Sequence, residues 1–354
     1  MKRRKSKLIK VGKVKIGAGN PIVVQGMTKT ETEDVASTVK QIQQLERAGA
    51  KIVRAAIPTA KAAKAISQIK DKIEVPLVAD IHFNYKLALE AIERGADKIR
   101  VNPGNMGKKE ILSVAERAEK KEIPLRIGVN EGSLKRDLAQ RIKAQADHPR
   151  VIARVMVESA LETVRLLEKN GFLNIIISLK SHNVFANIFS YQLIANKTFY
   201  PLHLGVTAAG PPPQGLVKAS IGIGALLAQG IGDTIRVSLT ADPVEEVRIA
   251  YEILHSLNLY KETPLLISCP TCGRCKVDMI SIVKDVLSGI RDTKIPLKIA
   301  IMGCEVNGPG EAKRADIGVV CGKREAILFK KGKAIRKVNE KDVVRVLLDY
   351  IRNY

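Results

Sequence analysis

Three of the chain's five cysteines stand in one short run, SCPTCGRC, as Cys269, Cys272 and Cys275. The other two, Cys304 and Cys321, follow in the last quarter of the 354 residues. Disulfides are rare inside cells, so clustered cysteines in an intracellular protein indicate metal or redox chemistry. Structural zinc commonly takes two close Cys/His pairs, and no histidine follows the run. The spacing therefore favours an iron–sulfur centre and leaves zinc as the alternative.

The segment around Cys304 reads GCEVNGPGEA. Its Gly-Pro-Gly stretch predicts a tight loop, which carries Glu311 seven residues after Cys304. In one interpretation this is a turn with a solvated glutamate. In the other, the loop returns a carboxylate to a metal held by Cys304.

Charged and polar side chains, most of them Arg or Lys, interrupt the apolar runs of the first 260 residues. A charge in an apolar run is costly unless it is paired, and acidic residues are scarce in these runs. An excess of cations predicts an anionic ligand with more than one negative charge, and Arg and Lys suit phosphate oxygens. For any single cation, pairing with an acidic neighbour or extension to solvent stays open. The residues are the cations Arg54, Arg100, Arg126, Lys180 and Arg236, the strand-end Asp80 with His82 after it, and Asn130.

Eight short β-branched runs must position these side chains. They alternate with amphipathic segments such as 33–50, 85–96, 158–171 and 242–257. Eight β-then-α units in about 250 residues predict a TIM barrel over residues 1–258, with its active site at the carboxyl ends of the strands. A doubly wound sheet is the alternative, weakened because no G-x-G-x-x-G follows the first strand. The runs are 21–25, 51–57, 76–80, 98–102, 124–129, 174–180, 202–206 and 234–239.

The pattern changes at residue 259. We expect a smaller α+β domain over 259–354 that is dedicated to a cofactor, because all five cysteines lie there. Helices are predicted over 277–290 and 340–351, and strands over 296–303, 315–322 and 325–333.

Composition limits the partners. A formal net charge of +23 attracts polyanions. Aromatic residues make up only 4% and Trp is absent, which argues against a nucleic-acid stacking platform. No apolar stretch approaches the length of a membrane span, so we expect a soluble cytoplasmic protein with neither a membrane nor a nucleic-acid partner.

Nearly the whole chain resembles the bacterial two-domain 4-hydroxy-3-methylbut-2-enyl diphosphate synthases (the IspG family) of the non-mevalonate isoprenoid pathway. The resemblance rests on stretches such as VPLVADIHFNYKLAL, KIRVNPGN, PLRIGVNEGSL and GIGDTIRVSLTADPVEEV, and most specifically on SCPTCGR with GCEVNGPGEA. It implies a TIM barrel followed by a [4Fe-4S] cluster domain. It also implies conversion of 2-C-methyl-D-erythritol 2,4-cyclodiphosphate to 4-hydroxy-3-methylbut-2-enyl diphosphate, a two-electron reductive ring opening with loss of water.

Carried over by matching positions, the family's cluster ligands fall on Cys269, Cys272, Cys304 and Glu311. Three thiolates would hold the cluster while a displaceable oxygen ligand leaves one iron accessible to a substrate oxygen. Cys275 and Cys321 lie outside this set, and we expect both to be dispensable for the cluster.

The resemblance also implies a substrate site and partners. Ferredoxin or flavodoxin would supply electrons, and two subunits of a homodimer would share each site. The chain departs from the family at Ala208, where HLGVTAAG replaces the usual HLGVTEAG. A paralogue with another phosphorylated substrate and a zinc-stabilised phosphate- or nucleic-acid-binding protein are the alternatives. The implied diphosphate ligands are Arg54, Arg100, Arg126, Asn130, Lys180, Arg236 and Ser238, and the implied catalytic groups are Asp80, His82, Asn307 and Glu311.

Overall fold

The computed structural model describes residues 2–291, 293–306 and 308–354, and the chain divides into two compact units, Met1–Leu259 and Tyr260–Tyr354. Each unit has its own sheet.

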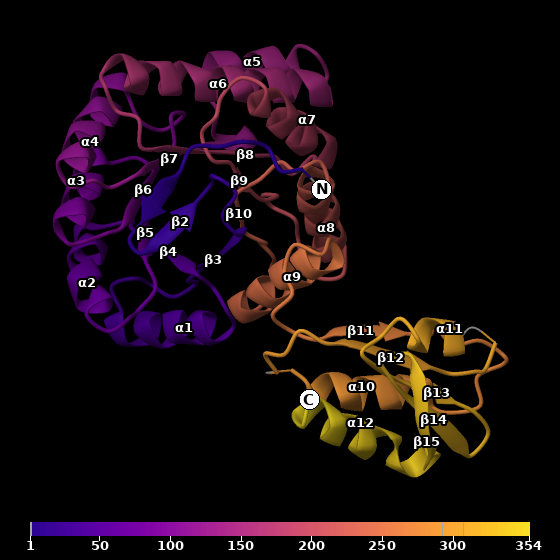
Figure 1. The fold of residues 1–354 in the computed structure, drawn as a ribbon. Coiled ribbons are helices and arrows are strands. Elements are labelled where there is room, and N and C mark those ends of the chain that lie inside the picture. The colour runs from indigo at the N-terminus through magenta and orange to yellow at the C-terminus, as the bar shows by residue number, and fades with distance from the viewer. Residues whose placement is uncertain (1, 292, 307) are drawn as a thin grey trace. The chain divides into compact units, whose positions relative to one another are not determined.

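The first unit is the predicted TIM barrel, and all eight predicted strands are confirmed (Figure 1). Its eight parallel strands follow the order β8-β7-β6-β5-β4-β3-β10-β9. A parallel bridge between Ile177 and Leu202 connects β8 to the segment that enters β9. The strands are β3 (Val23–Met27), β4 (Ile52–Ala56), β5 (Leu77–Asp80), β6 (Lys98–Val101), β7 (Leu125–Asn130), β8 (Ile175–Lys180), β9 (His203–Leu204) and β10 (Thr234–Ile235).

Helices surround this ring of strands (Figure 1). In α1 the side chains of Val39, Ile42 and Leu45 are buried, and the Asp34 side chain caps the helix by accepting from Ser37 N at 3.0 Å. The helices are α1 (Val35–Arg47), α2 (Ala60–Lys70), α3 (Tyr85–Glu93), α4 (Lys108–Lys120), α5 (Arg136–Lys143), α6 (Pro149–Lys169), α7 (Val184–Ala195), α8 (Gln214–Leu227) and α9 (Pro243–Ser256), with a 3-10 turn at Glu131–Ser133.

A small hairpin, β1 (Ile9–Val11) and β2 (Val14–Ile16), packs into the apolar interior of the barrel. Its Ile9, Val11 and Ile16 form one buried cluster with barrel residues that include Val23 and Val78. Val23 begins β3, so this cluster lies toward the amino ends of the strands. The hairpin therefore forms an apolar floor, and the opposite end of the barrel is left for a ligand.

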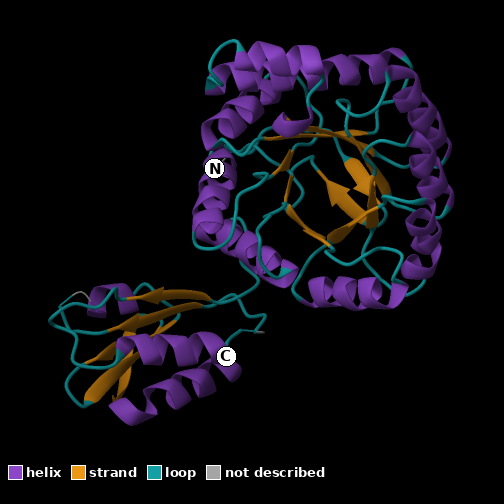
Figure 2. Cartoon of the chain, turned by 180° about the vertical axis from the view of Figure 1, so that it is seen from behind, coloured by secondary structure: helices purple, strands orange, loops and turns teal. Residues whose placement is uncertain are grey.

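The second unit is a five-stranded sheet in the order β11-β12-β13-β14-β15, with helices on both faces (Figure 2). The first three strands are parallel and the last three antiparallel. Both predicted helices and all three predicted strands are present. Two strands are additional, because the apolar run PLLIS and the lysine-rich KAIRKVN pair with neighbours. The elements are β11 (Leu265–Ser268), α10 (Met279–Gly289), β12 (Lys298–Met302), α11 (Gly308–Ala312), β13 (Ile317–Cys321), β14 (Glu325–Lys330), β15 (Lys333–Asn339), a 3-10 turn (Glu340–Asp342) and α12 (Val343–Arg352).

Among the described residues, no helix has both the length and the apolar composition needed to cross a bilayer. The cytoplasmic location stays a prediction.

Candidate active site

Asp80 is the centre of a buried charge cluster at the carboxyl end of β5. Arg100 Nη1 lies 3.2 Å from Asp80 Oδ1, and Arg54 Nε lies 3.7 Å from Asp80 Oδ2. His82 Nε2 lies 3.5 Å from Asp80 Oδ2 and 3.0 Å from Arg100 Nη1. Arg100 also donates to Gly128 O at 3.1 Å, and a Cβ at position 128 would lie 2.5 Å from Arg100 Nε. Glycine at this position leaves room for the guanidinium inside the barrel.

The electrostatics of Asp80 follow from these contacts. Burial by itself would raise the pKa of this carboxyl. Arg54, the hydrogen bond with His82, Arg100 and Arg126 together outweigh burial, so the pKa of Asp80 lies well below its ordinary value. Asp80 is therefore a carboxylate at neutral pH, and its role is to orient and partly neutralise the arginines.

Two more predicted cations are buried beside this cluster. Arg126 on β7 is 1% exposed, and its Nε and Nη1 have no hydrogen-bond partner among the described residues. Lys180 ends β8, and a Cβ on Gly205 would lie 2.8 Å from its Nζ. Burial, followed by the neighbouring arginines Arg126 and Arg54, places the pKa of Lys180 well below its ordinary value. Cations this close repel one another, and an anion between them would relieve the repulsion.

Arg236, the fifth predicted cation, has a partner that the sequence did not reveal. Its Nη2 lies 3.4 Å from Glu246 Oε2, and Glu246 also pairs with Lys29 at 3.0 Å. Glu246 is buried on α9. We expected few acidic partners on the strands, and that expectation did not consider the helices. Helix α9 supplies Glu246 as the partner of Arg236. Burial is the main reason that the pKa of Arg236 falls to about 10, with Arg54 adding to the shift.

The remaining predicted barrel residues lie at the strand ends. Asn130 is the last residue of β7, and its Cα pairs with that of Lys180. Ser238 is half-buried three residues after β10. Ala208 lies exposed four residues after β9 with a φ of 48°.

Sequence reasoning missed three buried polar residues of the barrel. Lys98 on β6, His203 on β9 and Gln25 on β3 each carry polar atoms with no hydrogen-bond partner among the described residues. A signal for Lys98 was available, because it stands two positions before Arg100 and alternate residues of a strand share a face.

In the second unit, strand alternation sorts the cysteines onto two faces of the sheet. Cys269 directly follows β11, and its N donates to Ile301 O of β12 at 3.0 Å. Cys269 packs against the buried cluster formed by Ala300, Met302 and the α11 residue Ala312. Cys304 follows β12 by two residues. Because β11 and β12 are parallel, both thiols stand at the carboxyl edge of the sheet.

Cys275 and Cys321 lie with the opposite face. Cys275 packs against the cluster of α10 and α12, to which buried Cys321 belongs. The Cys275 thiol donates to Val277 O at 3.4 Å, and burial raises the pKa of the Cys321 thiol to about 12. These two thiols therefore have surroundings typical of structural cysteines.

The predicted loop after Cys304 is wrong in one respect. Residues Gly308–Ala312 form a short helix, α11, rather than an open turn. Proline is tolerated in the first turn of a helix because its missing N–H would have no partner there. A Cβ on Gly308 would lie 2.6 Å from Val320 Cγ1, so glycine allows α11 to pack against the sheet. Through Ala312 the helix packs on the face that Cys269 occupies, and its Glu311 is exposed.

A metal centre is not assembled among the described residues, in which no three His, Cys, Asp or Glu side chains form a group that could hold a metal ion. The donor set is nonetheless suited to an iron–sulfur cluster, since Cys269 and the Glu311 helix share one face, Cys304 follows the neighbouring strand, and exposed Cys272 lies in the loop that follows Cys269. Asn307 lies outside the described residues.

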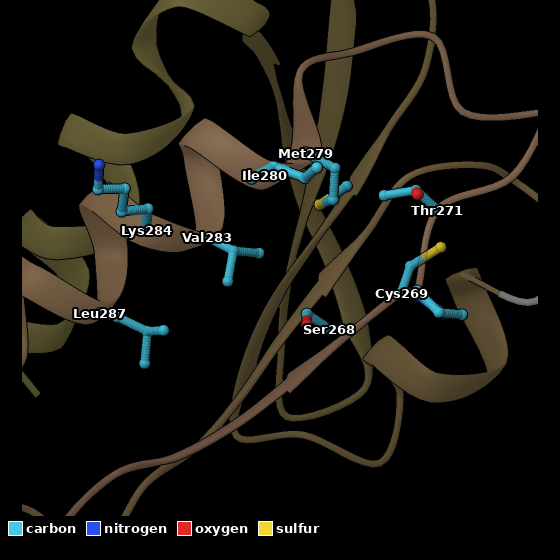
Figure 3. A pocket seen from close by; sticks show the side chains of 9 residues that line it. Ser268, Cys269, Thr271, Met279, Ile280, Val283, Lys284 and Leu287 are labelled. Carbon is cyan, nitrogen blue, oxygen red and sulfur yellow. The ribbon is translucent and has the colours of Figure 1, made fainter. Parts of the chain in front are cut away.

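A pocket opens beside this edge of the sheet, between β11 and α10 (Figure 3). Cys269 and Thr271 line it from the strand side, and Ile280, Val283 and Lys284 from the helix side. Ile280 is 73% exposed, so the pocket has an apolar outer wall.

The fold and the two sets of residues define a TIM-barrel protein with a polycationic interior and a separate cysteine-bearing sheet unit. The chain belongs to the GcpE family: the GcpE TIM-barrel domain matches residues 6–251 and the GcpE protein C-terminal domain matches residues 265–353.

Curated relatives are similar over their full length. A protein of Caldanaerobacter subterraneus subsp. tengcongensis is 53% identical over 99% of this chain and 97% of its own. One of Thermodesulfovibrio yellowstonii is 50% identical over 99% of both chains, and one of Clostridium tetani is 49% identical over 100% of both. Each of these relatives is named 4-hydroxy-3-methylbut-2-en-1-yl diphosphate synthase (flavodoxin).

Proposed function

We propose that this chain is a 4-hydroxy-3-methylbut-2-en-1-yl diphosphate synthase that reduces 2-C-methyl-D-erythritol 2,4-cyclodiphosphate, with flavodoxin or ferredoxin as electron donor. The observation that carries the proposal is the charge of the barrel interior. Among the described residues, six buried or nearly buried cations face two buried carboxylates, Asp80 and Glu246. A cyclic diphosphate supplies the missing negative charge. The cations are Arg54, Lys98, Arg100, Arg126, Lys180 and Arg236.

The barrel residues bind and orient the substrate in this proposal. A diphosphate can accept hydrogen bonds from the unpartnered Nε and Nη1 of Arg126 and can offset the positive charge of Lys180. Asp80 holds Arg54 and Arg100 in place. Charge-assisted hydrogen bonds of this kind are roughly twice as strong as neutral ones. His82, 43% exposed at the mouth and in contact with Asp80, is placed to hold or move a proton for the departing water.

Cys269, Cys272, Cys304 and Glu311 are the residues that we propose hold a [4Fe-4S] cluster. When bound, such a cluster supplies electrons and a Lewis-acidic iron for the reductive ring opening. Among three thiolates and one carboxylate, the carboxylate of Glu311 would be the ligand that a substrate oxygen displaces most easily. The separation of Cys275 and Cys321 onto the other face supports their exclusion from the set.

We further propose that the protein is a homodimer in which the second unit of one subunit completes the barrel site of the other. Mixing two inactive variants tests this arrangement. Arg126→Met inactivates the barrel and Glu311→Ala the cluster unit. In a shared-site dimer, mixed subunits regain one intact site. If each chain works alone, the mixture stays inactive.

The central test is turnover of the cyclodiphosphate by anaerobically reconstituted protein with reduced flavodoxin. We expect product formation, a [4Fe-4S] spectrum, and loss of turnover in Arg126→Met but not in the surface control Lys120→Met. Stoichiometric zinc without iron would contradict the proposal. A complete cluster without product from this substrate would instead favour a paralogue with another phosphorylated substrate.

A further inference from the structure

Lys98 is a fully buried lysine in the interior of the barrel. It begins β6, its Cα pairs with Val78 of β5, and its side chain is 0% exposed. Its Nζ has no hydrogen-bond partner among the described residues. Lys98 and Arg100 occupy alternate positions of one strand and point to the same side. Since Arg100 reaches Asp80 inside the barrel, Lys98 points into the same interior, one layer nearer the amino end.

Lys98 lies close to the apolar cluster at the amino end of the barrel. Val78, its neighbour on β5, belongs to the apolar cluster with the β1–β2 hairpin. Arg54 also pairs with Val78 through its Cα, from the other side. Lys98 and Arg54 therefore lie on either side of Val78, next to the apolar cluster, and Lys98 extends the group of interior cations on β6 toward the amino end of that strand.

The charged and titratable groups around this interior come from each neighbouring strand. Asp80 provides the negative charge closest to the arginines, and β3 contributes the neutral Gln25, whose amide is also unpartnered among the described residues. His203 donates to or accepts from Thr234 Oγ1 through Nδ1 at 2.7 Å, while its Nε2 is unpartnered there. The groups are Arg54 on β4, Asp80 on β5, Arg100 on β6, Arg126 on β7, Lys180 on β8, His203 on β9, and Arg236 just after β10.

We propose that Lys98 is a further member of the diphosphate site, and that binding of a diphosphate is coupled to uptake of a proton by its amine. The proposal rests on the proposed function for the identity of the anion. It extends that function by assigning to Lys98 a positioning and charge-matching role among the interior cations.

The energetics support this coupling. Burial, then Arg126 and Arg54, places the pKa of Lys98 well below its ordinary value, so the anion-free protein shifts this amine toward its neutral form. A diphosphate brings negative charge next to the same arginines and raises that pKa again. Linkage then requires that the complex binds more protons than the free protein over the pH range between the two pKa values. Within that range, each pH unit of increase weakens anion binding about tenfold per proton taken up.

Calorimetric titration with inorganic pyrophosphate tests the coupling on the full-length chain. Titrations in two phosphate-free buffers of different ionisation enthalpy, at the same pH, give the number of protons taken up. The protonation of pyrophosphate itself is common to all variants. We expect Lys98→Met to lower the uptake by up to one proton and to weaken binding at least tenfold, whereas exposed Lys120→Met changes neither. His203→Gln separates any contribution of that imidazole.

Thermal unfolding of the same variants covers the case in which Lys98→Met alters the fold. Methionine has similar length and no buried amine, so without pyrophosphate we expect the variant to unfold at or above the wild-type midpoint. Added pyrophosphate should raise the midpoint of wild type more than that of the variant. An unchanged proton count and affinity in Lys98→Met would overturn the inference.

The two proposals fail separately. Turnover of the cyclodiphosphate together with unchanged proton uptake in Lys98→Met would remove the role of Lys98 and leave the proposed function. Proton uptake that depends on Lys98 in the presence of pyrophosphate, without turnover of the cyclodiphosphate, would keep the role of Lys98 and remove the proposed function.

Discussion

Replacement of Asp80 by asparagine tests whether the buried cations of the barrel need a negatively charged partner. The side chain keeps its shape, but Arg54 and Arg100 lose the carboxylate that lies 3.7 and 3.2 Å from them. Asp80 is 4% exposed, so water cannot replace it. Removing one partner of a buried ion pair costs about 3–5 kcal/mol. For a unit of this size that loss lowers the unfolding midpoint by about 6–20 °C.

An anion should offset much of this loss. Pyrophosphate at 100 times its Kd stabilises a folded protein by about 2.7 kcal/mol. At equal pyrophosphate concentration we expect a larger rise in midpoint for Asp80→Asn than for wild type, because the anion also replaces the missing carboxylate and so binds the variant more tightly. The measurement is thermal unfolding in phosphate-free buffer with and without pyrophosphate. Glu93→Gln is the control, since Glu93 forms surface ion pairs with Arg117 and Lys121.

The pH dependence of the stability difference between wild type and Asp80→Asn provides a second test. The folded pKa of Asp80 lies well below its unfolded value, so the unfolded chain binds more protons between the two values and stability rises with pH there. The stabilisation by Asp80 is fully present above about pH 4 and is lost as pH falls toward the folded pKa. The difference between wild type and variant should therefore shrink below about pH 4. A variant as stable as wild type at neutral pH without anion would refute the charge argument.

Three further predictions concern both units. Cys269→Ala should lose cluster iron after anaerobic reconstitution while Cys275→Ala and Cys321→Ala retain it, as measured by iron content and visible absorption; the reverse pattern would disprove the ligand assignment. Gly303→Ala should destabilise the second unit by about 1–3 kcal/mol in urea unfolding, because a Cβ there would lie 2.5 Å from Cys275 Sγ, and Cys275→Ala in the same chain should restore stability. Glu246→Gln leaves Arg236 and Lys29 without their carboxylate and should cost about 3 kcal/mol in the same assay; an effect confined to catalysis would argue against the buried pair.

The barrel could be predicted from sequence because its strands are buried on both faces and read as continuous β-branched runs. The strand cations could be predicted for the same reason, since Arg100 and Arg126 stand out in apolar surroundings. Glu246 could not, because α9 is amphipathic and a glutamate on a helix normally faces solvent. Its burial depends on where α9 packs relative to β10, which is a tertiary property.

The cysteine unit shows a similar division. Spacing alone made Cys275 an equal of Cys269 and Cys272. Only the pairing of β11 with β12 reveals that the run leaves the strand edge and that Cys275 turns to the α10 face. Glu311 was found through resemblance, and its helix was missed because Gly-Pro-Gly resembles a turn locally while packing against Val320 favours a helix.

The hairpin at the amino end of the barrel determines the route by which molecules reach the cations. Ile9, Val11 and Ile16 close that end with a dry layer. Substrate, product, water and protons must all use the carboxyl end, so entry and release share one passage and cannot overlap in time. Any substrate that arrives before product leaves has to wait at the mouth. Product release is then a step that every turnover must complete before the next substrate molecule can bind.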